Sequence, residues 1–323
     1  MNVFYFAIVT SFFSLLFSSL ISEGLYKKIL LFFGISIYCL LIAFKGQAGS
    51  DTDLYYIAYS NYANDYKSFY MAGGFSEIGF WLINYFGFFS GFSFVYVNIV
   101  SAIFVFFSLY LVGVKKNPLL LLFYIPFVGF NIDFSTIRFS IAFHCFVILF
   151  LLFDRPFFSS VISGFFHKFG FLFFSVNFIN VSFKKLKGIH YFFFFIVLAP
   201  IGYYFYTEFI ERYLAYGSQF VFRDGFSFLL QSFLVLFICC LARFPVKNSI
   251  AIFLISMIPV GFRICGILIL VSDLKKSSII FNKVILYLIL IFFFFAKLIS
   301  FTNASLSIDG HKSIILHYSN FFI

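Results

Sequence analysis

The chain has 323 residues, of which 63% are hydrophobic and only 11% are charged. Soluble domains are roughly half apolar and a quarter charged, and a soluble globule of this length could not bury so much apolar side chain. Composition therefore excludes soluble, disordered, collagen-like and disulfide-stapled classes. It predicts an all-α polytopic membrane protein that forms a single transmembrane domain over residues 1–323.

The formal net charge of +10 is concentrated in six basic clusters between apolar stretches. Cytoplasmic loops of membrane proteins carry an excess of Lys and Arg, so we place all six clusters inside and expect no nucleic-acid partner. The five cysteines lie in apolar runs without C-x-x-C spacing, which favours neither a metal site nor a disulfide framework. The clusters are Lys27–Lys28, Lys115–Lys116, Arg155, 184–187, Arg243 with Lys247, and Lys275–Lys276.

The predicted elements follow from this charge pattern. Two stretches, 156–183 and 248–272, must leave and return between cytoplasmic clusters but are too short for two passes of about 20 residues each. We expect each to be a pair of short or broken helices, which gives about 10–12 membrane helices and is compatible with a GT-C-like architecture. The single passes expected in chain order are 2–22, 29–44, 94–114, 118–133, 136–153, 189–206, 225–242 and 278–299.

The tips of the two short pairs carry polar residues beside glycine, at His167–Gly170 and Pro259–Arg263. Non-helical backbone at membrane depth is tolerated only against protein or a water-filled cavity. The tips therefore indicate a cavity that opens toward the outer face.

Two outer loops, 45–93 and 207–224, are predicted to face the substrate. The first is rich in Tyr and polar residues over 49–70 and apolar over 77–90. The apolar part is too short to span and contains Trp81, so we expect a helix that lies in the membrane interface.

Three cationic side chains near or within the expected membrane are functional candidates. Arg138 begins a span on the outer side and could be a snorkelling residue or a clamp for a phosphate. His167 could be a structural residue or an acid, a base or a pyrophosphate donor. Arg263, at the second tip, requires a partner or water.

Asp51 and Asp53 form a D-x-D sequence that could hold a divalent ion, but we favour Asp51 as a group that orients or deprotonates a sugar hydroxyl, and we expect no metal or other cofactor. Lys45, Tyr55, Glu77 and Arg223 could line the same outer mouth or be solvated. A P-loop, H-E-x-x-H and G-x-S-x-G are all missing from the sequence, so ATP-driven transport, zinc proteolysis and serine hydrolysis have no support.

Six segments, taken in order, resemble the EpsG family of membrane polysaccharide polymerases, which is close in role to Wzy O-antigen polymerases. The match covers about residues 45–265 and departs from the family pattern at Phe139, where Gln is usual, at Phe169 and Gly170, where a small polar residue follows the His, and at Lys45, where Arg is usual. The segments are Gly49-x-Asp51-x-x-x-Tyr55, Glu77-x-Gly79-Phe80, Arg138-x-x-Ile141-Ala142, Phe166-His167-Lys168, Arg212-Tyr213-x-x-Tyr216 and the late Arg263.

The resemblance implies glycosyl transfer on the outer, periplasmic face of the bacterial inner membrane, for O-antigen or a related surface polysaccharide. A hydroxyl of one undecaprenyl-pyrophosphate-linked repeat unit attacks the anomeric carbon of the growing chain, and undecaprenyl pyrophosphate leaves. Arg138, His167 and Arg263 are expected to converge on that pyrophosphate. Membrane lipid and a chain-length regulator protein are further candidate partners.

Two other functions remain open from the sequence. A flippase or other transporter of the same lipid-linked oligosaccharide would need cationic residues in a cavity that reaches both faces. A membrane acyltransferase that modifies glycans would need a catalytic His beside a cytoplasmic donor tunnel, whereas His167 is predicted outside.

Overall fold

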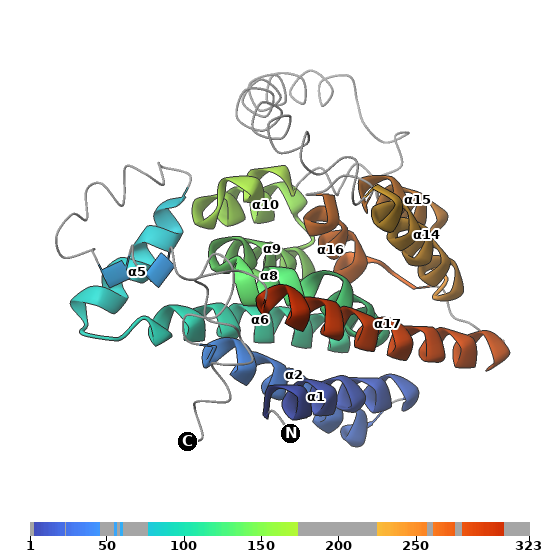
Figure 1. The fold of residues 1–323 in the computed structure, drawn as a ribbon. Helices are drawn as coiled ribbons and strands as arrows, with labels where there is room; N and C mark the ends of the chain where they lie inside the picture. Colours follow the sequence, from blue (N-terminus) through green and yellow to red (C-terminus); the bar gives the residue numbers. More distant parts are fainter. Residues whose placement is uncertain are drawn as a thin grey trace, which may run out of the picture.

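The computed structural model describes residues 3–22, 24–45, 55–56, 59–60, 77–173, 225–256, 261–274 and 280–306, and each regular element in these ranges is helical. Three of the helices are long and apolar enough to cross a membrane. These are α1 (Val3–Leu20), α2 (Leu25–Ala43) and α6 (Val95–Lys115), which match the first, second and third predicted passes closely. Figure 1 shows α1, α2 and α6 lying side by side. α17 (Ile280–Leu306) packs against α1, where the rings of Phe12 and Phe294 are stacked.

Small residues bring these helices close together. The backbone of Gly34 on α2 lies against Leu15 on α1, and Ser11 Oγ donates a hydrogen bond of 2.7 Å to the Gly34 carbonyl. Gly113 on α6 lies against the side chain of Leu31. Close approach through small residues and interhelical hydrogen bonds is the packing mode that operates where burial from water cannot drive association.

The fourth predicted pass is one helical rod with an irregular centre. It comprises α7 (Leu119–Tyr124), a π-helical segment η2 (Ile125–Gly129) and α8 (Phe130–Ser135). Pro126 has no N–H to donate to the carbonyl one turn earlier, so the winding changes at this point. The rod leads directly into α9 (Ile137–Phe153), the fifth predicted pass.

The two predicted short pairs are confirmed as short helices where the structure describes them. α15 (Val246–Ser256) and α16 (Gly261–Val271) run antiparallel: Cys265 Sγ donates to the Ile252 carbonyl at 3.4 Å, and Asn248 Nδ2 donates to Ser272 Oγ at 2.7 Å. α10 (Pro156–Phe166) ends at His167, where the 3-10 turn η3 (Lys168–Leu172) begins. The expected return over 174–183 lies outside the described residues, and so do the predicted pass 189–206 and the loop 207–224.

The apolar segment of the first outer loop forms the helix α5 (Ile78–Phe89), within the predicted 77–90. It buries Phe80, Asn84 and Gly87, and it exposes Leu82 and Phe86. α14 (Gly225–Leu241) and α17 correspond to the last two predicted passes. The total helix count stays a prediction, because 174–224 is not described.

Four of the six basic clusters lie at one end of the bundle. Lys115 Nζ donates to the Leu151 carbonyl at 2.9 Å, four residues before Arg155, and Lys116 pairs with Asp273 at 2.6 Å. Ser272, beside that Asp273, binds Asn248, so Arg243 and Lys247 share this end. Lys27–Lys28 also lies at this end, because Leu31, one turn later on α2, packs against Gly113, just before Lys115. α9 and α16 therefore both end at this basic end and run toward it in the same direction.

Candidate anion site at the start of α9

Arg138, in the first turn of α9, is paired with two residues from the first predicted outer loop. Its Nη1 forms an ion pair with Glu77 Oε2, and its Nε donates to the Tyr55 hydroxyl at 3.3 Å. The guanidinium carbon also lies 5.2 Å from the centre of the Tyr55 ring, a cation–π distance. The side chain of Arg138 is 31% exposed and that of Glu77 is 9% exposed. These residues, three of the sequence candidates, thus form one cluster at the rim of the bundle.

Glu77 is held in place by the packing of α5 on the end of α10. It occupies the N-cap position of α5, and a Cβ added to Gly79 would lie 2.8 Å from the Phe166 ring. This approach brings Lys168 within electrostatic reach of Glu77. Burial raises the pKa of Glu77, and the charges of Arg138 and Lys168 lower it by less than burial raises it.

His167 lies next to this cluster, at the junction of α10 and η3. Its ring contacts the ring of Phe139, the residue after Arg138, edge-on at 5.6 Å. Its Nδ1 accepts a hydrogen bond from the Phe169 N–H at 3.2 Å, which places the proton of a neutral ring on Nε2. Gly170 approaches the backbone of Ser163 so closely that a Cβ there would clash, which explains glycine in this turn.

Arg263 lies toward the same end of the bundle as Arg138. It lies in the first turn of α16, and Gly266, three residues later, contacts the ring of Phe143 on α9. Phe143 lies five residues after Arg138 and both helices run toward the basic end, so the first turns of α9 and α16 lie within about one helical turn of each other along the bundle. The side chain of Arg263 is outside the described residues, so its convergence on Arg138 stays a prediction.

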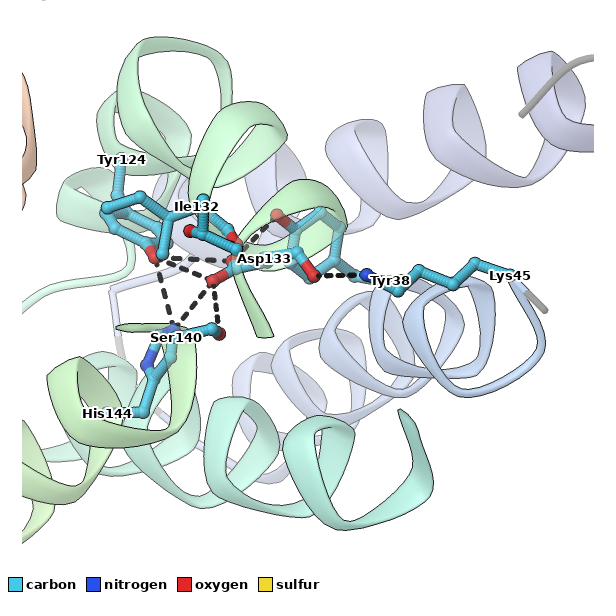
Figure 2. Close-up of polar contacts among 8 residues, drawn as sticks. Tyr38, Lys45, Tyr124, Ile132, Asp133, Ser140 and His144 are labelled. Atoms are coloured by element: carbon cyan, nitrogen blue, oxygen red, sulfur yellow. Dashed lines mark hydrogen bonds and ion pairs between the residues drawn. The ribbon is translucent and has the colours of Figure 1, made fainter. Parts of the chain in front are cut away.

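The remaining candidates divide into those not described and one that is deeply buried. Asp51, Tyr216 and Arg223 lie outside the described residues. Lys45 is fully buried, and its Nζ donates to the carbonyls of Asp133 at 3.4 Å and Phe134 at 2.5 Å (Figure 2). The ammonium thus binds the last carbonyls of α8, where a cation complements the helix dipole. A substrate contact by Lys45 stays a prediction.

A buried polar network that was not predicted lies around Asp133, and Ser140 and His144 of α9 contribute to it (Figure 2). Its centre is Asp133, whose carboxylate accepts hydrogen bonds from Tyr38 at 2.9 Å, Tyr124 at 3.1 Å and Ser140 at 3.1 Å. His144 Nε2 lies 2.9 Å from the same carboxylate and 3.1 Å from the Tyr124 hydroxyl. All five side chains are buried.

The signal for this network was present in the sequence. Ser140 and His144 are four residues apart on one helix, which places both on one face, and Asp133 precedes them inside an apolar region. The contact between Asp133 and Tyr38 of α2 could not be predicted, because no local pattern shows that α2 packs against this face of α9. Gly129 in the π-helical segment permits the approach, since a Cβ there would lie 2.6 Å from the Tyr38 hydroxyl.

The cluster at the start of α9 has the composition of an anion site. Arg138 and Lys168 supply two positive charges against the one carboxylate of Glu77, and His167 adds a ring N–H nearby. A guanidinium presents a planar fork that suits phosphate oxygens. Within the described ranges, His, Cys, Asp and Glu side chains do not gather in groups of three or more that could hold a metal ion.

Comparisons with known proteins leave the family unassigned. A scan of protein-family models, a search of curated proteins and a search of solved structures each found no match.

Proposed function

We propose that this chain is a polytopic membrane glycosyltransferase, similar to EpsG and Wzy polymerases, that joins undecaprenyl-pyrophosphate-linked repeat units on the outer face of the bacterial inner membrane. The observation that supports it is the meeting of four segments that carry the resemblance. Tyr55, Glu77 and Arg138 come from separate parts of the chain and contact one another at the end opposite the basic clusters, and His167 packs on the adjacent Phe139.

The chemistry fits such a cluster. A sugar hydroxyl forms the new glycosidic bond at the anomeric carbon, the bond from that carbon to the pyrophosphate breaks, and the hydroxyl proton passes to a base, for which Asp51 is the candidate. Negative charge grows on the pyrophosphate as its bond breaks. Arg138, His167 and Arg263 are the proposed donors that stabilise this charge, because donors fixed in a partly dry site favour the transition state.

The proposed location has a direct topology test. In a variant without the exposed native thiol of Cys240 (Cys240→Ser), we expect a membrane-impermeant maleimide to label Asp65→Cys in intact cells. Asp154→Cys, at the basic end, should react only after the membrane is opened. The reverse labelling pattern would overturn the sidedness, and labelling of both positions in intact cells would contradict the three passes predicted between them.

The function itself is tested in a strain that lacks this gene. Glycan gels should show loss of long chains with retention of core plus one repeat unit, and a plasmid copy of the gene should restore the ladder. Retention of full-length chains would contradict polymerase activity.

The Asp133 network favours a transporter as the second candidate. Buried ionisable pairs within membrane helices often serve ion-coupled transport, and the Asp133–His144 pair lies beside a π-helical segment. The discriminating observation is whether an Arg138→Ala strain still delivers single repeat units to the outer surface. Delivery indicates a polymerase, and its loss indicates a flippase.

A further inference from the structure

We propose that Glu77 is an internal counter-ion that competes with the pyrophosphate for Arg138, so that the substrate must displace a carboxylate in order to bind. This inference rests on the proposed function and adds a control of affinity to it. Glu77 would then weaken anion binding, the opposite of a residue that contacts the substrate favourably.

The geometry makes the competition direct. The ion pair is formed by Nη1 of Arg138, and Tyr55 takes Nε, so two of the three guanidinium nitrogens already have partners. A phosphate that used the fork in two-pronged fashion would need one of these nitrogens. Of these two partners only the Glu77 carboxylate is negatively charged, since the Tyr55 hydroxyl is neutral. An anion therefore competes with Glu77 for the positive charge of Arg138.

The surroundings of Glu77 favour its displacement. Its side chain is 9% exposed, so the carboxylate has lost most of its hydration, and burial raises the pKa of Glu77. Lys168 lies close enough to influence that charge. Its ammonium is the proposed donor to the Glu77 carboxylate when Arg138 binds a phosphate instead. The backbone is held by the contact between Gly79 and Phe166, so displacement requires only rotation of the Glu77 side chain.

The test is binding of inorganic pyrophosphate to the purified full-length chain, measured by calorimetry. We expect Glu77→Gln to bind about tenfold more tightly than the native chain, which corresponds to roughly 1.4 kcal/mol. Arg138→Ala should lose binding, and in the Arg138→Ala background Glu77→Gln should change nothing, since the carboxylate then has no cation to block. Asp154→Asn, which removes an exposed acid near the basic end, is the matched control and should bind as the native chain does.

The pH dependence sharpens the test. Glu77 faces Arg138 and Lys168, Tyr55 contacts the other side of the Arg138 guanidinium, and His167 precedes Lys168 in the chain. As pH falls, protonation removes the negative charge of Glu77, so the native chain should approach the affinity of Glu77→Gln. The ratio of the two Kd values cancels the titration of pyrophosphate itself and should shrink toward one at acidic pH.

The outcomes separate this inference from the proposed function. If Glu77→Gln binds as the native chain does, or more weakly, while Arg138→Ala loses binding, the counter-ion role is overturned and the anion site stands. If Arg138→Ala binds like the native chain, or if neither the native chain nor Glu77→Gln binds, both are overturned. Should Glu77→Gln fail to fold, Glu77→Asp, whose carboxylate is one methylene shorter, is expected to tighten binding in the same direction.

Discussion

We expect Asp133→Ala to lower the free energy of unfolding by about 3–5 kcal/mol, which is the usual cost of removing one partner from a buried ionisable pair. The carboxylate accepts hydrogen bonds from three hydroxyls and lies against the His144 ring, and all of these groups are buried. Without it, these donors have lost their shared acceptor and cannot reach water instead. The network joins α2, the α7–α8 rod and α9, so its loss loosens the helix that carries Arg138.

The native cysteines supply the measurement. Cys39, Cys145, Cys239 and Cys265 are buried, so a thiol-reactive dye reports unfolding as they become accessible during heating. We expect a large fall in the unfolding temperature for Asp133→Ala. Ser140→Ala removes one neutral donor and should cost about 1 kcal/mol. Asp154→Asn, in an exposed position, should leave the temperature unchanged. A native-like temperature for Asp133→Ala would show that the network does not hold these helices together.

Hydropathy and charge were sufficient to predict the helices, because each membrane span must satisfy its backbone within itself. α2, α6, α9 and α14 begin and end within a few residues of the predicted passes, and the short pair α15–α16 was inferred from its length between two basic clusters. The gathering of Lys27–Lys28, Lys115–Lys116, Arg155 and Arg243 at one end also follows from the charge pattern.

The packing between helices was much less predictable. Glu77 and Tyr55 were expected to line the same outer mouth as Arg138 or to be solvated, but their contacts with Arg138 were not predicted, because 61 and 83 residues separate them from it. Lys45 was expected to line the outer mouth or to be solvated, yet it is fully buried and its ammonium binds the α8 carbonyls. Both contacts depend on which faces of the helices meet, and apolar faces rich in Phe carry little information about their partners.

The largest functional effect is expected at Arg138. In the proposed polymerase, Arg138→Ala should abolish long glycan chains while leaving core plus one repeat unit, since removal of one fixed donor to a developing anion costs about 100- to 1,000-fold in rate. Arg138→Lys should restore long chains poorly, because an ammonium keeps the charge but lacks the planar fork that can donate to Tyr55 and pair with two phosphate oxygens.

The control must separate loss of this fork from loss of positive charge in general. Arg155→Ala removes an Arg at the basic end, beyond the end of α9, and should give a normal ladder with native protein levels. Membrane levels of Arg138→Ala, measured on immunoblots, should also match the native chain, because α9 is held by the Asp133 network on a different face. A normal ladder in Arg138→Ala would contradict the proposed role of Arg138 in stabilising the charge on the leaving pyrophosphate. An equally short ladder in Arg155→Ala would trace the defect to net charge or insertion instead of the site.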